Sequence, residues 1–202
     1  MSIAPDFEEM YTADPDPWEV ATSWYERRKT QVLLACLRRQ RYGTVWEVGC
    51  GTGDLTALLA ARSDRVVATD ATERACELTR TRCATESGVV VERSALPLPP
   101  EALRGRPADL VVLSEVLYYL PEADRHAAAD TLAAACAPEG DIVAVHWSAT
   151  TEGASVSGIG AHRDLDRALI ERGWWRLVAH RDVEFTLTLW SRDMPATIGR
   201  NR

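Results

Sequence analysis

Short apolar runs alternate with longer segments of helical period through most of the chain. The pattern predicts strands at 45–48, 65–69, 89–92, 108–114 and 142–147, and helices at 22–40, 54–62, 72–86 and 122–136. Residues 108–114 are apolar in their middle, which is typical of a strand buried on both faces. Strands that alternate with helices form a parallel sheet covered by helices on both sides. The sequence therefore predicts an α/β fold.

The pattern changes after a helix expected at 163–172. Two strand-like runs, 174–181 and 183–190, follow without a helix between them, and apolar residues recur at every second position from Val183 to Leu189. This arrangement predicts an antiparallel hairpin at the end of a seven-stranded, mostly parallel sheet. A chain of 202 residues is long enough for one such domain.

Two local motifs refine this picture. Ser23 and Glu26 have the spacing of a capping box, in which each side chain bonds the backbone N–H of the other residue at the start of a helix. Residues 148–161 are small, polar and rich in glycine, and they follow the last strand of the parallel part. We expect them to form a mobile loop over the carboxyl ends of the strands, where ligands bind in open α/β sheets.

The acidic charge is concentrated at the start of the chain. Residues 1–19 hold six carboxylates and no Lys or Arg, and so account for most of the net charge of −7. We expect an irregular acidic arm at 1–21, one folded domain at 22–193 and a tail at 194–202. The arm is either a solvated tail or an acidic lid that favours cationic ligands. The nearly neutral remainder lacks the basic surface typical of nucleic-acid binding.

The cysteines and the apolar runs indicate the cellular compartment in which the protein is expected. The five cysteines form no CxxC pair, and the first residues lack the basic flank and apolar run of a signal peptide. An odd cysteine count without a secretory signal favours reduced thiols in the cytoplasm. No stretch approaches the roughly 18 apolar residues of a membrane span. We therefore expect a cytoplasmic protein without a metal or a membrane partner, either a monomer or a homodimer.

The strongest chemical signal is a glycine-rich turn between the first expected strand and its helix. The segment reads Glu47-Val48-Gly49-Cys50-Gly51-Thr52-Gly53. Glycines at such a turn bring backbone N–H groups close to a ligand. The dinucleotide fingerprint GxGxxG would need glycine at position 54, which is Asp54. No Gly-Lys-Ser/Thr follows either, so a phosphate-binding P-loop is excluded.

Two carboxylates narrow the ligand class. Glu47 lies two residues before the first glycine, where it suits a cationic group such as the ammonium of an amino acid. Asp70 ends the second expected strand, where a carboxylate accepts hydrogen bonds from both hydroxyls of a ribose. A ligand with an ammonium group, a ribose and no pyrophosphate is S-adenosylmethionine.

These residues resemble the first motif of the class I S-adenosylmethionine-dependent methyltransferases, ExGxGxG followed by an acid at the end of the second strand. The chain is similar in particular to the nodulation protein S-like N-methyltransferases. Three stretches carry that likeness: Asp16-Pro17-Trp18 with Trp24-Tyr25-Glu26-Arg27, Glu47 to Cys50, and Ser114-Glu115-Val116-Leu117-Tyr118-Tyr119-Leu120. The resemblance implies a single Rossmann-like methyltransferase domain that methylates an amine, such as that of a deacetylated amino sugar.

The resemblance also implies a set of cofactor contacts. Ser94, Ala95 and Leu96 follow the third expected strand, where the family contacts adenine; Ser94 replaces the more common Asp, and its alternative role is to cap the turn. The complete set of expected cofactor-binding residues is Glu47, Gly49, Cys50, Gly51, Gly53, Asp70, Ala71, Ser94, Ala95, Leu96 and Ser114.

Two residues at strand ends are candidates for catalysis. Glu115 ends the fourth expected strand, beside the point of methyl transfer that the resemblance implies, where its carboxylate would hold a substrate ammonium or accept its proton. His146 ends the fifth, and an imidazole with an ordinary pKa near 6.5 suits a general base at neutral pH. The alternative for His146 is a surface or capping histidine.

Further side chains are candidates for contact with the substrate. Tyr118 and Tyr119 could form a wall of the pocket, since an aromatic face attracts cations. His162 lies just beyond the expected mobile loop, so that it could swing toward the ligand. The alternative for Tyr118 and Tyr119 is that one packs in the core and the other covers the helix. The alternative for Trp18 and Tyr25 is a hydrophobic staple that fixes the helix. Lys29 is expected on a solvated helix face. The candidate substrate contacts are Trp18, Tyr25, Tyr118, Tyr119, Trp147 and His162.

Three functions remain open at the level of sequence. The first is a methyltransferase for the amine of a small molecule, an amino sugar or a related amine, in oligosaccharide or natural-product biosynthesis. The second is a small-molecule O-methyltransferase with His146 as base. The third is a module that binds S-adenosylmethionine without catalysis, which the complete glycine motif disfavours.

Overall fold

The computed structural model describes residues 5–194 and contains one seven-stranded sheet with the strand order β3-β2-β1-β4-β5-β7-β6. Strands β1 to β5 pair in parallel, and β7 pairs antiparallel with both β5 and β6. The predicted α/β fold and its terminal antiparallel hairpin are therefore confirmed. The strands are β1 (Tyr42–Val48), β2 (Ser63–Asp70), β3 (Val89–Arg93), β4 (Ala108–Ser114), β5 (Cys136–Trp147), β6 (Trp175–Arg181) and β7 (Phe185–Ser191).

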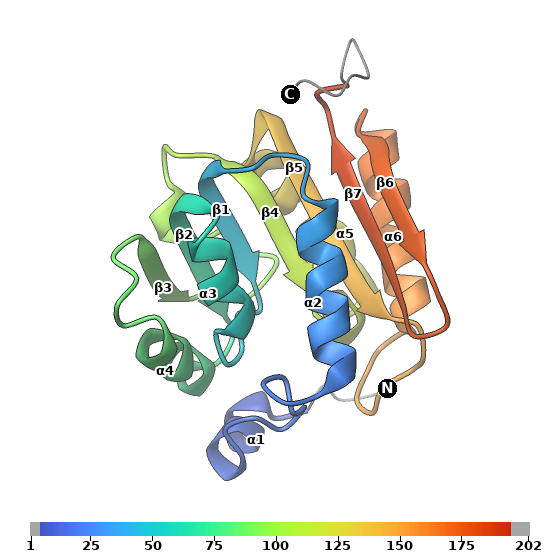
Figure 1. The fold of residues 1–202 in the computed structure, drawn as a ribbon. Helices are drawn as coiled ribbons and strands as arrows, with labels where there is room; N and C mark the ends of the chain where they lie inside the picture. Colours follow the sequence, from blue (N-terminus) through green and yellow to red (C-terminus); the bar gives the residue numbers. More distant parts are fainter. Residues whose placement is uncertain (1–4, 195–202) are drawn as a thin grey trace.

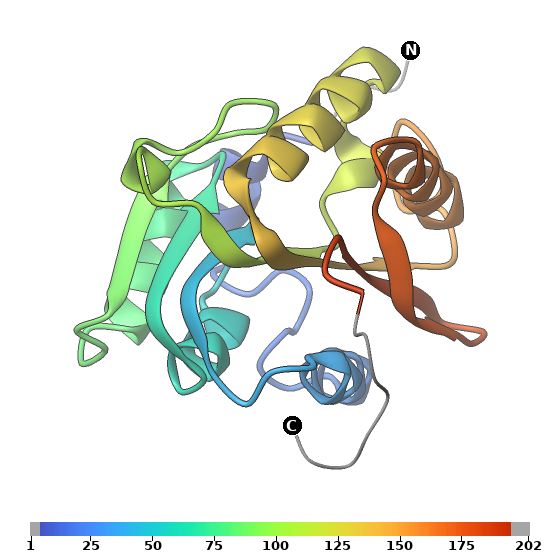
Figure 2. The ribbon, with the colours of Figure 1, turned by 90° about the horizontal axis from the view of Figure 1, so that it is seen from above.

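Helices cover both faces of the sheet. Helices α5 and α6 pack together on one face, and α2 and α3 lie on the other (Figure 2), with α4 beside α3 and against β2 and β3. Helix α1 lies apart from these layers, below the carboxyl ends of the parallel strands in Figure 1. The helices of the described chain are α1 (Phe7–Ala13), α2 (Trp24–Cys36), α3 (Asp54–Ala60), α4 (Glu73–Arg82), α5 (Glu122–Ala135) and α6 (Gly158–Glu171), with short 3-10 turns at Glu101–Leu103 and Leu117–Tyr119.

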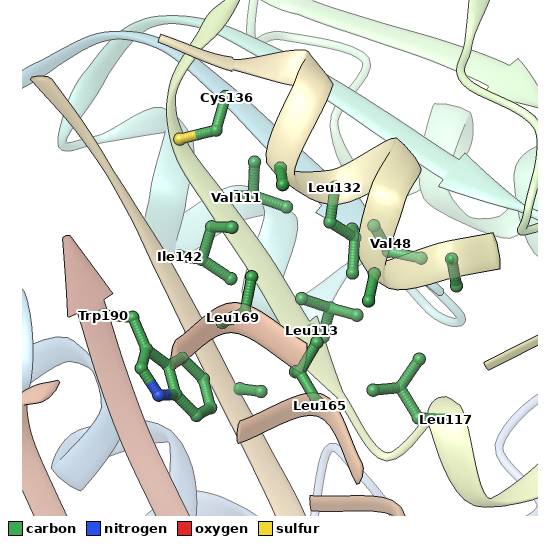
Figure 3. Close-up of a cluster of buried hydrophobic side chains, with 14 of the residues drawn as sticks. Val48, Val111, Leu113, Leu117, Leu132, Cys136, Ile142, Leu165, Leu169 and Trp190 are labelled. Atoms are coloured by element: carbon green, nitrogen blue, oxygen red, sulfur yellow. The ribbon is translucent and has the colours of Figure 1, made fainter. Parts of the chain in front are cut away.

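The alternation of side chains along the central strands divides the core into two clusters. In β4, Val111 and Leu113 face α5 and α6 and pack with Leu132 and Leu165 (Figure 3). Leu110 and Val112 face the other side, in the cluster that contains Leu33 of α2 and Leu59 of α3. Residues 110–113 are fully buried, which confirms the prediction of a strand covered on both faces.

The structure corrects three expectations, one about the arm and two about where an element begins. The arm is not irregular throughout, because Asp6 caps helix α1 by accepting a hydrogen bond from the Glu9 N–H. Helix α6 begins at Gly158, inside the expected loop, since the Ser157 side chain accepts a bond from the Gly160 N–H. Strand β5 begins at Cys136, well before the expected residue 142. The expected tail lies outside the described residues except for Met194.

None of the helices in the part of the chain that the structure describes is both long enough and apolar enough to cross a bilayer.

Candidate functional site

A cavity of about 320 Å³ lies at the carboxyl ends of the parallel strands. Its walls come from the glycine-rich turn after β1, the ends of β2, β4 and β5, the turn after β3, helix α2 and the N-terminal arm. Sixteen of the residues expected at the site line it: Trp18, Tyr25, Glu47, Gly49, Cys50, Gly51, Asp70, Ala71, Ser94, Ala95, Leu96, Ser114, Glu115, Tyr118, Tyr119 and Trp147. The topology therefore brings together most of the residues that the sequence indicated.

The glycine-rich turn needs its glycines for two reasons. Gly49, Gly51 and Gly53 all have positive φ angles, of 76°, 53° and 81°, which favour glycine. A Cβ on Gly49 would stand 2.4 Å from a methyl carbon of Val116, and one on Gly53 would stand 2.9 Å from Cα of Thr79. Gly53 caps α3 and does not line the cavity. Its role in this structure is to let α3 and α4 approach each other.

The carboxylate of Asp70 is fixed at the cavity wall by the turns around it. Its Oδ2 accepts a hydrogen bond from the Gly51 N–H at 3.1 Å, and its Oδ1 accepts bonds from the N–H and the hydroxyl of Thr72, each at 3.0 Å. Burial raises the pKa of Asp70, while these donors oppose the rise. The carboxylate is thus held in one orientation with oxygen acceptors at the cavity.

Glu47 is almost fully buried beneath the glycine-rich turn, with 2% of its surface exposed. Its Oε2 accepts a hydrogen bond of 2.5 Å from the hydroxyl of Thr56. Burial raises the pKa of Glu47 to about 8, and the nearby carboxylate of Asp70 adds to the rise. A cation that reaches Glu47 through the cavity would favour its ionised form.

The turn after β3 supplies one side of the cavity through Ser94, Ala95 and Leu96. The backbone N–H of Ser94 donates to the carbonyl of Asp70 at 2.9 Å, which ties this turn to the end of β2. The Ser94 hydroxyl donates to the carbonyl of Leu98 at 3.4 Å. Ser94 therefore both lines the cavity and caps its own turn.

Glu115, which follows β4 at the cavity wall, is the centre of a hydrogen-bond network. Its Oε1 accepts bonds from the Tyr25 hydroxyl at 2.9 Å and from Lys29 Nζ at 3.0 Å. Its Oε2 accepts a bond from the backbone N–H of Trp147 at 2.8 Å. The Glu115 backbone has a φ of 61°, a conformation that is strained for a residue other than glycine. Such strain is common at functional sites.

Lys29 lies in this network and not on a solvated helix face, so the expectation for it is wrong. Only 2% of its surface is exposed, and its ammonium bridges Glu115 and Glu26, the latter at 2.8 Å. Burial of an unpaired charge is unfavourable, and two carboxylates supply the compensation here. Glu26 and Lys29 both line the cavity.

The N-terminal arm covers the cavity with aromatic side chains. Phe7 packs edge-on against Tyr119, with ring centroids 4.8 Å apart, and Tyr11 packs edge-on against Trp18 at 5.4 Å. All four side chains line the cavity, whereas the carboxylates of the arm do not. Instead, Asp6 caps α1 and Glu8 accepts bonds from the first N–H groups of α4, at 2.9 and 3.1 Å. The inner face of the arm is therefore aromatic.

The two candidate histidines do not reach the cavity, so the expectation that they face the ligand is wrong. His146 is fully buried on the α6 side of β5, and its Nδ1 lies 3.1 Å from Nδ1 of His162. His162, in the second turn of α6, is also buried, and its Nε2 is 2.8 Å from the hydroxyl of Thr188. Burial lowers the pKa of both imidazoles to about 3. Their arrangement is that of a neutral, buried hydrogen-bonded pair.

Sequence reasoning missed several residues of the cavity wall. Phe7 and Tyr11 lie in the arm, for which an irregular structure was expected. Glu26 was expected to bond the backbone at the start of a helix, as part of a capping box. The apolar spacing of α1 was a possible signal, but the segment is only seven residues long. The residues that line the cavity without having been expected are Phe7, Tyr11, Val20, Glu26, Lys29, Thr30, Val48, Thr52, Asp54, Leu55, Val116, Leu120 and Thr151.

Sequence comparison places the chain among known relatives. Residues 6–151 match the family model of nodulation protein S (NodS). The nodulation protein S of Bradyrhizobium diazoefficiens is 30% identical over 135 residues, which cover 63% of this chain and 61% of that protein. The chain thus matches less than two thirds of the length of this curated relative.

Two solved structures share the fold. One is a Pseudomonas syringae protein described as a candidate methyltransferase, 38% identical with a TM-score of 0.70, and the match covers 84% of this chain and all of that one. The other is N-methyltransferase NodS from Bradyrhizobium japonicum in complex with S-adenosyl-L-homocysteine. It is 22% identical with a TM-score of 0.77, and the match covers 91% of this chain and 95% of that one.

Proposed function

The chain belongs to the nodulation protein S family, and from this premise we propose that it transfers a methyl group from S-adenosylmethionine to the amine of a small molecule. The observation that carries the proposal is the charge of the cavity wall. Five carboxyl groups and a single ammonium line it: Glu26, Glu47, Asp54, Asp70 and Glu115, with Lys29. Even with Glu47 protonated at pH 7, four carboxyl groups remain to oppose the one ammonium. A wall of this charge favours cations, and both the sulfonium cofactor and a protonated amine are cations.

The residues present fit S-adenosylmethionine. Asp70 offers carboxylate oxygens to a ribose, Glu47 offers a buried carboxyl to an ammonium, and the turn after β3 offers a wall to an adenine. A Cβ on Gly49 would stand 2.4 Å from Val116 and one on Gly51 would stand 2.9 Å from the Tyr11 hydroxyl, so the turn can line the cavity only with glycine at both positions. When bound, this cofactor supplies an electrophilic methyl group on a sulfonium.

The chain itself contributes position and exclusion of water. The aromatic side chains of the arm and Trp147 form a cover over the cavity, so that cofactor and acceptor meet in a confined space. An amine must be neutral to attack, and the carboxylates near Lys29 provide an acceptor for its proton. We propose more specifically that the methyl acceptor is an amino sugar or a related amine, because the chain belongs to the nodulation protein S family.

A second candidate, an O-methyltransferase that uses a histidine base, has less support. His146 and His162 lie outside the cavity, and their lowered pKa values make them weak bases. A hydroxyl acceptor would therefore lack the base on which that mechanism depends.

The test is formation of S-adenosylhomocysteine with matched pairs of amines and alcohols, including amino sugars and their hydroxyl counterparts. We expect turnover with amines and none with the corresponding alcohols. Turnover with alcohols alone would favour O-methylation, and binding of the cofactor without turnover of any acceptor would favour a non-catalytic module.

Cofactor binding is expected to release a proton from Glu47. Because burial raises the pKa of Glu47 to about 8, the free protein holds that proton at pH 7. An ammonium group placed against the carboxylate lowers its pKa, so the proton leaves when the ligand binds. Calorimetry at pH 7 in buffers of different ionisation enthalpy measures the number of protons released.

The Glu47→Gln variant supplies the control for this proton release. It keeps the shape of the side chain and has no proton to release, so its binding enthalpy should not depend on the buffer. Equal release by both proteins would show that the proton comes from another group, and would remove Glu47 from its assigned place beside the ammonium.

A further inference from the structure

Glu26 does not perform the capping role that its position in the sequence predicts. Ser23 is the N-cap of α2, yet its side chain makes no capping hydrogen bond. The Ser23 N–H, which Glu26 would bond in a capping box, donates instead to the carbonyl of Glu19 at 2.8 Å. The carboxylate of Glu26 is therefore free of the helix terminus, and it turns to Lys29 and the cavity.

One oxygen of Glu26 remains available to a ligand. Oε1 accepts the hydrogen bond from Lys29, and within residues 5–194 this is the one hydrogen bond that the Glu26 carboxylate makes. The side chain is 14% exposed, at the surface of the cavity. Burial raises the pKa of Glu26, although Lys29 opposes the rise. A carboxylate in this setting accepts a proton more readily than an exposed one.

Glu115 differs in that its oxygens are already engaged. Three donors bond it: the Tyr25 hydroxyl, Lys29 Nζ and the Trp147 N–H. A carboxylate has about four acceptor positions, so Glu115 keeps one, beside the Trp147 N–H, whereas Glu26 keeps three. Together, Glu26, Lys29 and Glu115 carry one net negative charge, which one bound ammonium would neutralise.

We propose that Glu26, and not Glu115, is the carboxylate that binds the ammonium of the acceptor and takes its proton. The inference rests on the proposed function and specifies the residue that prepares the amine. The proton passes from the ammonium nitrogen to Oε2 of Glu26, which leaves a neutral amine with a free lone pair and a neutral carboxylic acid. Glu115 and Lys29 form the fixed ion pair that holds Glu26 in position.

The test compares the binding of two cofactor analogues by calorimetry, and it needs no knowledge of the acceptor. Sinefungin carries an amine in place of the methylated sulfonium, whereas S-adenosylhomocysteine has a neutral sulfur there. The wild-type protein should prefer sinefungin. Glu26→Gln should reduce that preference about tenfold or more, the range of a charge-assisted hydrogen bond, and should leave the affinity for S-adenosylhomocysteine unchanged.

Two further variants complete the comparison. Glu122→Gln removes an exposed carboxylate from α5 and should keep the wild-type preference. Glu115→Gln should reduce the preference less than Glu26→Gln, and it should lower the temperature of unfolding because Lys29 loses a partner. Thermal unfolding of Glu26→Gln checks that this variant is folded.

The outcomes separate this assignment from the proposed function. An unchanged preference in Glu26→Gln, or a larger loss in Glu115→Gln than in Glu26→Gln, would overturn the role of Glu26 while the cofactor site stands. If the wild-type protein binds neither analogue, the proposed function fails, and the assignment of Glu26 fails with it.

Discussion

Replacing Asp70 by Asn is expected to weaken the binding of S-adenosylmethionine by at least about a hundredfold. The carboxylate is oriented by the N–H groups of Gly51 and Thr72, and both of its oxygens can accept bonds from a ribose. Hydrogen bonds to a charged group contribute about 1.5–3 kcal/mol each. Asn loses one acceptor oxygen and the charge that strengthens the bond to the other, so the expected loss is about 3 kcal/mol. The amide of Asn also presents an N–H where an acceptor is required. Calorimetric titration with the cofactor measures the effect.

A matched control lies at the other end of the same strand. Asp64 follows the first residue of β2, is exposed, and accepts a hydrogen bond from Arg41 at 2.6 Å. Asp64→Asn should bind the cofactor as the wild-type protein does. Equal affinity in Asp70→Asn and the wild type, with both proteins folded, would remove Asp70 from the cofactor site.

Deletion of residues 1–14 is expected to weaken cofactor binding at least tenfold, with little dependence on salt. The arm presents Phe7 and Tyr11 to the cavity, while Glu8 fixes the arm to the N-terminus of α4. At about 25 cal/mol per Å², roughly 60 Å² of apolar surface buried against the cofactor accounts for a tenfold change. Burial of apolar surface is not screened by salt, so titration at low and high ionic strength should give the same ratio.

The acidic-lid interpretation predicts a different result for the same arm. Glu9 and Glu19 are exposed carboxylates that cap neither α1 nor α4. Neutralising both with Gln should leave the affinity for cofactor and acceptor unchanged if the arm acts through its aromatic side chains. A marked loss in that double variant, abolished by salt, would support the acidic lid instead.

The elements that local pattern determines are the ones that the sequence predicted well. Strand β4 is apolar at consecutive positions because both faces are covered, and Gly49 to Gly53 mark the turn because positive φ angles require glycine. The site residues contributed by these turns and strand ends follow directly, because the carboxyl ends of parallel strands meet at one edge. For that reason Glu47, Asp70 and Glu115 reach one cavity.

The features that depend on distant partners were not predictable in the same way. Lys29 is buried because Glu115, 86 residues away, accepts its hydrogen bond. Helix α1 is seven residues long, too short to be stable alone, and it is held by contacts with α4 and Tyr119. The local sequence does not identify the partner of Lys29 or the partners of α1.

For His146, by contrast, a signal was present in the strand period. Ile142 and Ala144 belong to the cluster under α5 and α6, and His146 is in phase with them. Val143 and Val145 face α2, and Trp147, in phase with these, reaches the cavity. Counting by twos from the centre of β5 would have placed the histidine away from the ligand and the tryptophan beside it.

The most direct test of methyl transfer to an amine is the fate of a labelled methyl group. The protein is incubated with S-adenosylmethionine that carries ¹³C in its methyl group and with an amino sugar, and the product is examined by NMR. We expect a new methyl resonance coupled to the carbon that bears the nitrogen, together with S-adenosylhomocysteine. A label found only on a hydroxyl oxygen would contradict methyl transfer to an amine.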